Sequence, residues 1–599
     1  MASPGPSAAG PASRAIRHAA LEILNCGIKS TKEEISEALN RIGISNFIKI
    51  SKGNNEPKCR VTFVSAEDKN LALDRIARNP AVTDEAEGPW KVKSVFQRYL
   101  KVAPEKEAAI QQKKAADAVA PWREFPYPEQ LKKKHDQVKE ANEKWLSKLG
   151  IKDYAFHDIV ASPVTQEYRN KLDFTVGLDG DGKPCAGFRV GSYREGGKSS
   201  FRVEVSDDCL LTSPKIGLKV AEFLSNFMQS STLPVYDQDK HVGFWRAVSV
   251  RWSEKTKELM VLIRCAPEGD AEAEKTRVCN AFRDEFEFEG VKVTSLFWQW
   301  WDGISHQAPP ESGFIHIFGK EYIEDEILGM RFKVSNGAFF QVNTRGAEVL
   351  FTVVRNLLQG KPHDAPPSPS SENSSTRGSL PMLLDVCCGT GVIGLLCADS
   401  ASSVAGIELS APAVLDAREN AETNGLDGKA RFICSKAESV LSRLLSGKAK
   451  EMLAKSDTVL TEVDERVLEE ALKDAQASKE IVAIVDPPRA GLHPSVLKAL
   501  LRCHAVSRII YVSCNPTGSF VDNAMDLCGN KPIISNKRDV RETEGIVSFK
   551  PVQFIPVDMF PHTDHCELVA EFVRPRKTTD GNDADHAKRV KTDEAVNDE

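Results

Sequence analysis

The sequence contains no run of 18 or more apolar residues, and its fourteen cysteines include no Cys-x-x-Cys pair. The first absence argues against a membrane-spanning helix, which needs about 20 consecutive apolar residues. The second removes the usual ligand spacing of zinc ribbons and iron–sulfur clusters, so we expect no metal site. The net charge is −6, so the chain is not globally basic. If it binds nucleic acid, it must use local patches.

A chain of 599 residues is too long for one hydrophobic core and should divide into several domains. Four polar segments, in part rich in Pro, Ser or Ala, are predicted to be tails, linkers or inserts: residues 1–15, 101–121, 360–379 and 576–599. We therefore expect three domains, at 16–100, 122–335 and 336–575. Residues 1–15 lack the continuous apolar segment of a secretory signal.

The first domain alternates strand-like and helix-like segments in the order βαββαβ, a pattern that resembles an RNA-recognition motif (RRM). Its first helix, predicted over 31–43, begins with a capping box formed by Thr31 and Glu34. The strand expected to carry base-stacking aromatics offers mainly Phe63, so only part of a stacking platform is predicted.

The middle domain, at 122–335, is rich in short β patterns and predicts an RNA-binding surface. Basic residues interleaved with aromatics suit contacts to a nucleic-acid backbone and its bases. The alternative is an ordinary sheet whose edge residues happen to be basic. The candidates are Tyr168, Arg169, Lys171, Phe188, Arg189, Tyr193 and Arg194.

The third domain opens with an apolar strand, 382–386, followed by a glycine-rich turn, a helix and a second strand that ends at Glu408. Gly389 and Gly391 allow a tight turn and a close backbone approach to a ligand. Such a turn fits dinucleotide sites as well. Asp385, four residues before the first glycine, favours instead the first motif of S-adenosylmethionine-dependent methyltransferases, and so does Asp486-Pro-Pro at the end of a later apolar strand.

A further apolar strand, 509–512, delivers Cys514 at its carboxyl end, where open α/β sheets hold their ligands. Pro516 should stop that strand and keep the thiol at the edge of the sheet. Near the end of the chain, Glu567 begins a final strand after a turn rich in Pro, His and Asp. The pattern predicts a thiol and a carboxylate at the rim of one sheet.

Five motifs occur in the order found in the RNA uracil-5-methyltransferase family, which the chain resembles over roughly 155–220 and 320–575: FFQVNT, LDVCCGTGVIG, DPPRAG, YVSCNP and FPHTDHCE. The layout, with an RRM-like domain at the N-terminus, is similar to that of animal tRNA-modifying members. The barrel domain and four-cysteine cluster of ribosomal-RNA members have no counterpart here. Cys387 replaces an aromatic residue of the bacterial tRNA enzymes, which puts packing against the donor there in doubt.

The resemblance implies an α/β, Rossmann-like methyltransferase domain that binds S-adenosyl-L-methionine. It implies that the donor is contacted by Gln341, Asp385, Gly389, Gly391, Glu408 and Asp486. Cys514 would be the nucleophile and Glu567 the proton acceptor, with Asp486 and Arg489 holding the donor side and the base. The implied substrate is uridine 54 in the T-loop of tRNA, turned out of its loop. We expect a monomer.

The chemistry of uracil explains this set of residues. Carbon 5 is a weak nucleophile until a thiolate adds to carbon 6, and a base must afterwards remove the carbon-5 proton. Cys514 and Glu567 supply the thiolate and the base, and Arg489 or Asp486 would serve the enolate oxygen. The thiol should be partly ionised near neutral pH, assisted by a neighbouring cation.

Two other functions remain open from the sequence. Cytosine-5 methylation is disfavoured because no cysteine stands beside the Asp-Pro-Pro motif. An RNA-binding or tRNA-folding role, with further targets such as mRNA, is compatible with the same fold. In the tail, Lys588, Arg589 and Lys591 resemble a nuclear-import signal, so we expect the protein in the nucleus and cytosol.

Overall fold

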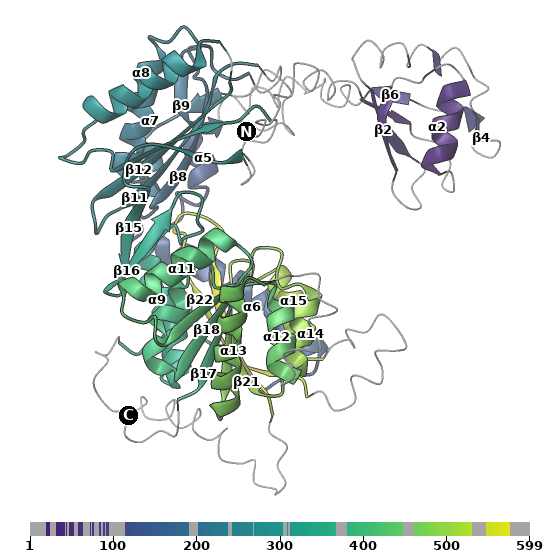
Figure 1. Ribbon diagram of the computed structural model, residues 1–599, viewed down its shortest axis with the longest axis vertical. Coiled ribbons are helices and arrows are strands. Elements are labelled where there is room, and N and C mark those ends of the chain that lie inside the picture. Colours follow the sequence, from purple (N-terminus) through teal and green to yellow (C-terminus); the bar gives the residue numbers. More distant parts are fainter. Residues whose placement is uncertain are drawn as a thin grey trace, which may run out of the picture. The chain divides into compact units, whose positions relative to one another are not determined.

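In the computed structural model the chain divides into two compact units, which are described separately (Figure 1). The first comprises Met1–Lys113 with Gly191–Phe201, and the second Lys114–Val190 with Arg202–Glu599. The residues that the structure describes are 20–23, 31–41, 44, 47–52, 58–63, 72, 75–76, 83–84, 88–89, 92–94, 114–190, 202–237, 242–267, 269–303, 308, 312–366, 380–446, 460–529 and 547–575. The predicted tails, 1–15 and 576–599, lie outside them, as do Tyr193 and Arg194.

The first unit contains a four-stranded antiparallel sheet in the order β2-β3-β1-β6. Its elements are β1 (Ala20–Ile23), α2 (Lys32–Arg41), β2 (Phe47–Lys52), β3 (Cys59–Phe63) and β6 (Val92–Ser94), and a small hairpin joins β4 (Thr83–Asp84) to β5 (Gly88–Pro89). The predicted capping box is confirmed, because Glu34 N donates to Thr31 Oγ1 (3.2 Å) and Thr31 N donates to Glu34 Oε2 (2.8 Å). Apolar residues of α2 pack on the sheet.

Phe63 does not form the stacking surface that the sequence suggested. Its side chain is 1% exposed and lies in the core of the first unit with Val61 and Leu39. Successive residues of a strand point to opposite faces, so Val61 and Phe63 share the buried face while Arg60 is exposed. A base cannot stack on Phe63 without unfolding this core.

The second unit carries a seven-stranded sheet in the order β10-β9-β8-β11-β12-β13-β14. Its strands are β8 (Lys171–Leu178), β9 (Pro184–Val190), β10 (Arg202–Glu204), β11 (Trp245–Ser253), β12 (Glu258–Cys265), β13 (Ser295–Trp300) and β14 (Ile315–Gly319). Helices α7 (Lys215–Met228) and α8 (Ala271–Asp284) share one apolar core with alternate residues of these strands. The opposite face carries polar side chains such as Asp173 and Ser249, which are cross-strand partners.

The same unit contains an eight-stranded mixed sheet in the order β19-β18-β17-β20-β21-β23-β22-β7. Its strands are β7 (Ala155–Phe156), β17 (Met382–Val386), β18 (Ser403–Glu408), β19 (Ala430–Cys434), β20 (Ile481–Val485), β21 (Val506–Ser513), β22 (Lys550–Val557) and β23 (Glu567–Val573). Pairs from β19 to β21 are parallel, whereas β23 runs antiparallel to both β21 and β22. The predicted α/β fold is therefore confirmed.

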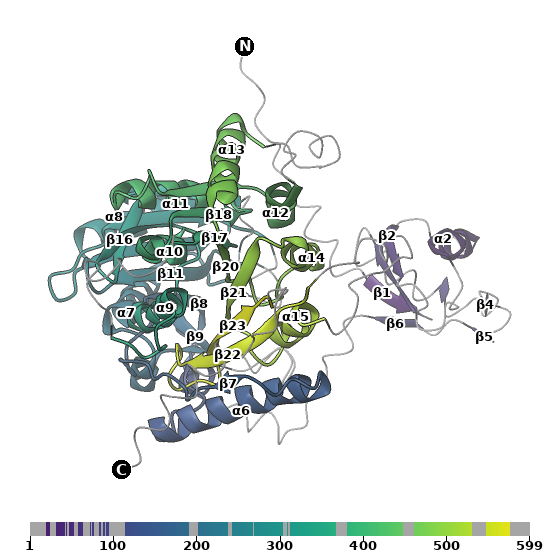
Figure 2. The same ribbon diagram turned by 90° about the horizontal axis from the view of Figure 1, so that it is seen from below.

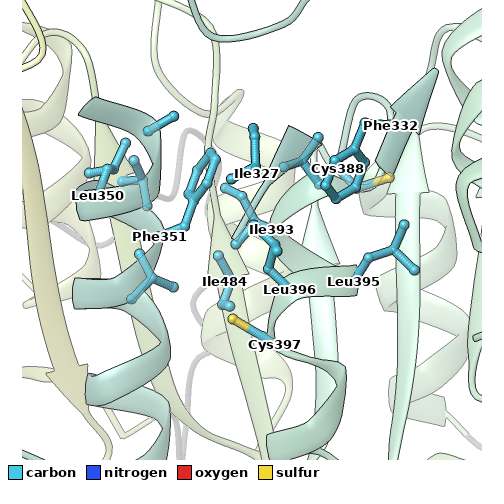
Figure 3. Close-up of a cluster of buried hydrophobic side chains, with 14 of the residues drawn as sticks. Ile327, Phe332, Leu350, Phe351, Cys388, Ile393, Leu395, Leu396, Cys397 and Ile484 are labelled. Atoms are coloured by element: carbon cyan, nitrogen blue, oxygen red, sulfur yellow. The ribbon is translucent and has the colours of Figure 1, made fainter. Parts of the chain in front are cut away.

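Helices cover both faces of this sheet (Figure 2). One face packs against α9 (Thr344–Gln359), α10 (Val392–Leu396) and α11 (Ala411–Thr423), and Figure 3 shows part of that core around Phe351, Ile393 and Ile484. The other face packs against α6 (Tyr127–Lys148), α12 (Ala437–Ser446), α13 (Glu462–Ala477), α14 (Pro494–Arg502) and α15 (Ser519–Leu527). Strands buried on both faces read as continuous apolar runs, as at 481–485.

Some residues assigned from sequence to the linker and middle domain pack elsewhere. Helix α5 (Ala115–Val119), at the end of the predicted linker, belongs to the second unit. Trp145 and Leu146 of α6 lie in the core of the eight-stranded sheet, and β7 pairs with β22. The hairpin of β15 (Tyr322–Ile327) and β16 (Met330–Ser335) also packs against that sheet's core. The sequence of an amphipathic segment shows which of its faces is apolar, but not which part of the fold that face packs against, so these segments could not be assigned from sequence.

The predicted insert begins where α9 ends. Gly360, the C-cap, has a φ of 62°, a left-handed conformation that glycine adopts without strain. Residues 361–366 are described and 367–379 lie outside the described residues. Throughout the described part of the chain, no helix is both long and apolar enough to cross a bilayer.

Candidate active site

The glycine-rich turn joins β17 to α10 through three residues in the left-handed backbone conformation. Cys387, Gly389 and Gly391 have φ values of 64°, 53° and 79°. A Cβ on Gly391 would stand 2.7 Å from the ring of Phe432, so any side chain there clashes as well as straining the backbone. Gly394 N donates to Asp385 Oδ2 (2.8 Å), which ties the start of α10 to the strand. The turn has the shape that the sequence predicted.

Glu408, at the end of β18, lies against this turn. Its Oε2 accepts from Gly389 N (3.1 Å), and its Oε1 accepts from Leu409 N (2.7 Å) and Ser410 N (2.9 Å). Asp385 is fully buried, and its Oδ1 has no hydrogen-bond partner among the described residues. Burial, and then the charge of Glu408, raises the pKa of Asp385 to about 7. Two acids at one turn favour a ligand that carries donors or positive charge.

Asp486 extends the same edge of the sheet. It follows β20, and its backbone N donates to Val386 O at the end of β17 (3.3 Å). Burial, and then the charge of Asp385, raises the pKa of Asp486 to about 7. The structure thus brings Asp385, Glu408 and Asp486 to the carboxyl ends of three neighbouring parallel strands.

Cys514 and Glu567 meet at the next two strands. Cys514 follows β21 directly, and Ser513 is the cross-strand partner of Leu568. Since β23 is antiparallel to β21, Glu567 at its start lies beside the residue that follows Ser513. The Cys514 side chain is half-buried, whereas Glu567 is 2% exposed. The predicted thiol and base are adjacent.

Hydrogen bonds join the loop of Cys514 to the loop of Arg489. Asn515 Nδ2 (3.2 Å) and Ser519 Oγ (2.9 Å) both donate to Arg489 O. Asn523 Oδ1 accepts from Leu492 N (2.7 Å) and from Tyr511 Oη (2.8 Å). Arg489 itself is exposed. The sequence analysis missed these supporting residues, although Asn515 stands inside the motif that delivers the cysteine.

The electrostatics of the thiol differ from the expectation of partial ionisation. Burial, followed by the negative charges of Glu567 and Asp486, raises the pKa of Cys514 to about 11, and Arg489 opposes the rise. Burial and Asp486 also raise the pKa of Glu567 to about 8, again opposed by Arg489. The expected cation is present, but burial and the two acids outweigh it. In this state the thiol holds its proton at neutral pH.

The segment of Gln341 is held by Asn170. Asn170 Nδ2 donates to Gln341 O (2.8 Å) and to Thr344 Oγ1 (2.9 Å), while its backbone N donates to Val342 O (2.7 Å). Asn343 caps α9 by accepting from Gly346 N (2.8 Å). Gln341 is partly buried at this junction.

Not all of the predicted RNA-binding residues are open to RNA. Tyr168 is 7% exposed, and its Oη donates to Pro561 O (3.0 Å), so it is a packing residue rather than a stacking one. Arg169, Lys171 and Arg189 remain partly exposed. Lys171 Nζ lies 3.6 Å from Asp173 Oδ2.

Comparison with known proteins decides the family. The family model for tRNA (Uracil-5-)-methyltransferase matches residues 372–535. Human tRNA (uracil-5-)-methyltransferase homolog B is 33% identical, over 77% of this chain and 84% of its own length. The chain belongs to the tRNA (uracil-5-)-methyltransferase family. Mouse tRNA (uracil-5-)-methyltransferase homolog A is 29% identical, over 94% of this chain and 86% of its own length.

The chain is also similar to a crystal structure of Pyrococcus abyssi tRNA (uracil-54, C5)-methyltransferase in complex with S-adenosyl-L-homocysteine. That likeness has 22% sequence identity and a TM-score of 0.48, over 82% of this chain and 91% of that chain.

Family membership confirms two predictions from the sequence. The protein is a tRNA (uracil-5-)-methyltransferase, and its methyl donor is S-adenosyl-L-methionine. The residues fit that donor: Glu408 at a strand end suits ribose hydroxyls, and the Cβ-free turn at Gly389 and Gly391 lets the backbone approach it. The buried, unpartnered Oδ1 of Asp385 suits a donor group or a positive charge.

Proposed function

We propose that this tRNA (uracil-5-)-methyltransferase forms 5-methyluridine at uridine 54 of the tRNA T-loop through a covalent adduct between Cys514 and carbon 6 of uracil. The observation that supports it most is the adjacency of a half-buried thiol and a buried carboxyl at the ends of β21 and β23. These are the two groups that activation and release of carbon 5 require.

Cys514 and Glu567 carry the proposed steps at carbons 6 and 5 of uracil. The Cys514 thiol first gives its proton to water. The resulting thiolate adds to carbon 6, and the ring electrons move onto oxygen 4 as an enolate, with Arg489 as the nearby cation. Carbon 5 then takes the methyl group, whose former sulfonium leaves as a neutral thioether. Glu567 removes the proton from carbon 5, the double bond between carbons 5 and 6 re-forms, and the thiolate is expelled.

The donor supplies an electrophilic methyl group when bound. The residues that would hold it are Gln341, Asp385, Glu408 and Asp486, with the backbone of Gly389 and Gly391. The acids whose pKa values burial raises to about 7, Asp385 and Asp486, would be ionised more readily beside a positive sulfonium. Donor and acid charges then stabilise one another.

For the RNA substrate, we propose that the first unit is RRM-like and that the seven-stranded sheet contributes RNA contacts. The strand order β2-β3-β1-β6, with α2 after the first strand, supports the first assignment. Arg169, Lys171 and Arg189 support the second, because all three are basic and partly exposed. With Phe63 and Tyr168 buried, these contacts would be to the RNA backbone more than to bases. Nuclear import through Lys588, Arg589 and Lys591 stays a proposal too.

The mechanism is tested with tRNA that carries 5-fluorouridine, because fluorine at carbon 5 cannot leave as a proton does. Wild-type enzyme with the donor should form a complex stable to denaturing electrophoresis, and Cys514→Ala should form none. Glu567→Gln should trap the corresponding adduct with ordinary tRNA. A complex that persists in Cys514→Ala, or none in the wild type, refutes the covalent route. Digestion of the product to nucleosides must give 5-methyluridine; 5-methylcytidine would refute the base assignment.

The second candidate is an RNA-binding or tRNA-folding function, which the proposed RRM-like assignment of the first unit favours. It would coexist with methylation, since opening the T-loop exposes it to refolding. If Cys514→Ala abolished methylation yet still rescued a tRNA-dependent growth defect, binding would be the dominant role.

A further inference from the structure

The connection between β22 and β23, residues 558–566, is fixed by distant parts of the chain. It begins at Asp558 and leads into Glu567, whose cross-strand partner is Val557. Four successive carbonyl oxygens in it accept hydrogen bonds from groups far away in the sequence. The pairs are Asn343 Nδ2 to Met559 O (2.9 Å), Lys134 Nζ to Phe560 O (2.9 Å), Tyr168 Oη to Pro561 O (3.0 Å) and Trp122 N to His562 O (2.9 Å).

The backbone of this loop is not in a relaxed conformation. His562 has a φ of 66°, in the left-handed region that residues other than glycine seldom adopt. Such a conformation persists where the surroundings over-determine it. Gln130 holds His562 in this conformation, since Gln130 Oε1 accepts from His562 N (2.7 Å) and Gln130 Nε2 lies 3.2 Å from His562 Nδ1.

Helix α6 presents these contacts from one face. Tyr127, Gln130 and Lys134 stand at positions i, i+3 and i+7, which lie on one side of an α-helix. Gln130 and Lys134 are fully buried. Tyr127 Oη accepts from Ser162 N (2.9 Å), and Ser162 Oγ in turn accepts from Asn343 Nδ2 (3.3 Å). One helix face therefore contacts the loop directly through Gln130 and Lys134, and through Ser162 and Asn343 from Tyr127.

The centre of this face is a buried ion pair. Lys134 Nζ lies 2.7 Å from Asp558 Oδ1, and both side chains are 0% exposed. The same Asp558 oxygen accepts from Phe560 N (3.0 Å), so the pair closes the first turn of the loop. A buried pair gains little stability over an apolar pair of similar shape, because both charges lose their hydration. What it does provide is a defined geometry.

We infer that Lys134, through Asp558, is a positioning residue that holds the loop so that the Glu567 carboxylate reaches the carbon-5 proton. This inference rests on the proposed covalent mechanism, because proton removal from carbon 5 is the step that it governs. Lys134 is fully buried and would act through the turn at Asp558–Phe560 and the hairpin that ends at Glu567. Cys514 follows β21, outside this loop, so we expect its attack on carbon 6 to depend on the loop less than proton removal does.

The test separates the two steps. In Lys134→Met with Asp558→Asn the charges disappear together, which avoids the unpaired buried ion that a single change would leave. The amide oxygen introduced by Asp558→Asn would still accept from Phe560 N. Lys134→Met, in contrast, would remove the ammonium group that donates to Phe560 O. We expect kcat on ordinary tRNA to fall ~10- to 100-fold, the cost typical of a misplaced reacting group. The KM values for donor and tRNA should change less than about threefold.

The decisive readout is the covalent adduct. With ordinary tRNA the double variant should accumulate adduct during turnover, whereas wild type should show little. With 5-fluorouridine tRNA the variant should form adduct at the wild-type rate, since that reaction stops before proton removal. Lys132→Met, on the same helix at an exposed position, is the matched control and should behave as wild type.

Two results would overturn the inference, and a third would overturn the covalent mechanism on which it rests. One is equal slowing of adduct formation and of turnover, which would mean general damage to the site. Another is turnover at the wild-type rate. The third, no adduct with 5-fluorouridine tRNA in the wild type, would instead refute the covalent mechanism itself. The single variant Lys134→Met should accumulate the same adduct with ordinary tRNA and have lower thermal stability than the double variant. If Lys134→Met formed no adduct at all, that result would count against Lys134 as a positioning residue for Glu567.

Discussion

Replacing Glu567 by glutamine should make the free enzyme more stable at alkaline pH while it blocks release of the product. The carboxyl is 2% exposed, and burial and the charge of Asp486 raise its pKa from 4.5 to about 8. A carboxyl with a raised pKa keeps its proton in the folded state when the unfolded chain has lost it. Its contribution to stability is therefore fully present below pH 4.5 and is lost as the pH rises through 8.

The size of the effect follows from that window. Each pH unit between the two pKa values changes the stability by about 1.36 kcal/mol. From pH 6 to pH 9 the wild type should lose roughly 2–3 kcal/mol that the neutral glutamine keeps. For a unit of several hundred residues, whose unfolding entropy is about 1 kcal/mol/K, that corresponds to roughly 2–3 °C in unfolding midpoint. The gain of Glu567→Gln over wild type should thus be larger at pH 9 than at pH 6 by this amount.

Thermal unfolding of both proteins without donor at pH 6, 7.5 and 9 measures the difference. Because a chain with several domains need not unfold in two states, the comparison is between midpoints of the same transition. Glu422→Gln, at an exposed position of α11, is the control and should give no pH-dependent gain. A Glu567→Gln protein less stable than wild type at pH 9, or a gain independent of pH, would show that the carboxyl is not the desolvated group inferred here.

Two further substitutions have expected outcomes. In Gly391→Ala the new Cβ would stand 2.7 Å from Phe432, on a backbone with a φ of 79°. The change should therefore cost more than about 1 kcal/mol of stability and raise the KM for the donor at least tenfold. An unchanged KM in steady-state kinetics would contradict the close approach of the donor to this turn. Phe63→Ala should destabilise the first unit by about 3–5 kcal/mol. Limited proteolysis should then cut that unit faster, while the unfolding midpoint of the second unit stays unchanged. Equal protease resistance of variant and wild type would contradict the burial of Phe63.

The sequence was sufficient to predict the parts of the site that follow strand ends. Asp385, Glu408, Asp486 and Cys514 each follow or end an apolar run, and parallel strands bring their carboxyl ends to one edge. Glu567 reaches that edge for a different reason, since β23 is antiparallel and begins where its neighbours end. Local pattern and a common topology were enough to predict these five positions together.

What the sequence analysis missed depends on contacts between distant segments. Tyr168 looked like a stacking residue because basic residues surround it, yet its hydroxyl donates to Pro561, almost 400 residues away. Lys134 gave no signal in the sequence, where it is the last of three consecutive lysines, because its partner Asp558 lies 424 residues away. Phe63 is the exception, because the alternation of Cys59, Val61 and Phe63 already places it on the buried face.

The protonated thiol of Cys514 implies an order for activation. Two of the causes that raise its pKa to about 11 are the charges of Glu567 and Asp486. Burial raises the pKa values of both acids as well, to about 8 for Glu567 and about 7 for Asp486, so the charge on each depends on what occupies the site. A bound sulfonium adds positive charge beside the acids and favours the thiolate as well. Under the proposed covalent mechanism, the free enzyme would therefore keep Cys514 protonated, and the thiolate would be needed only after the donor and the uridine have replaced water around it.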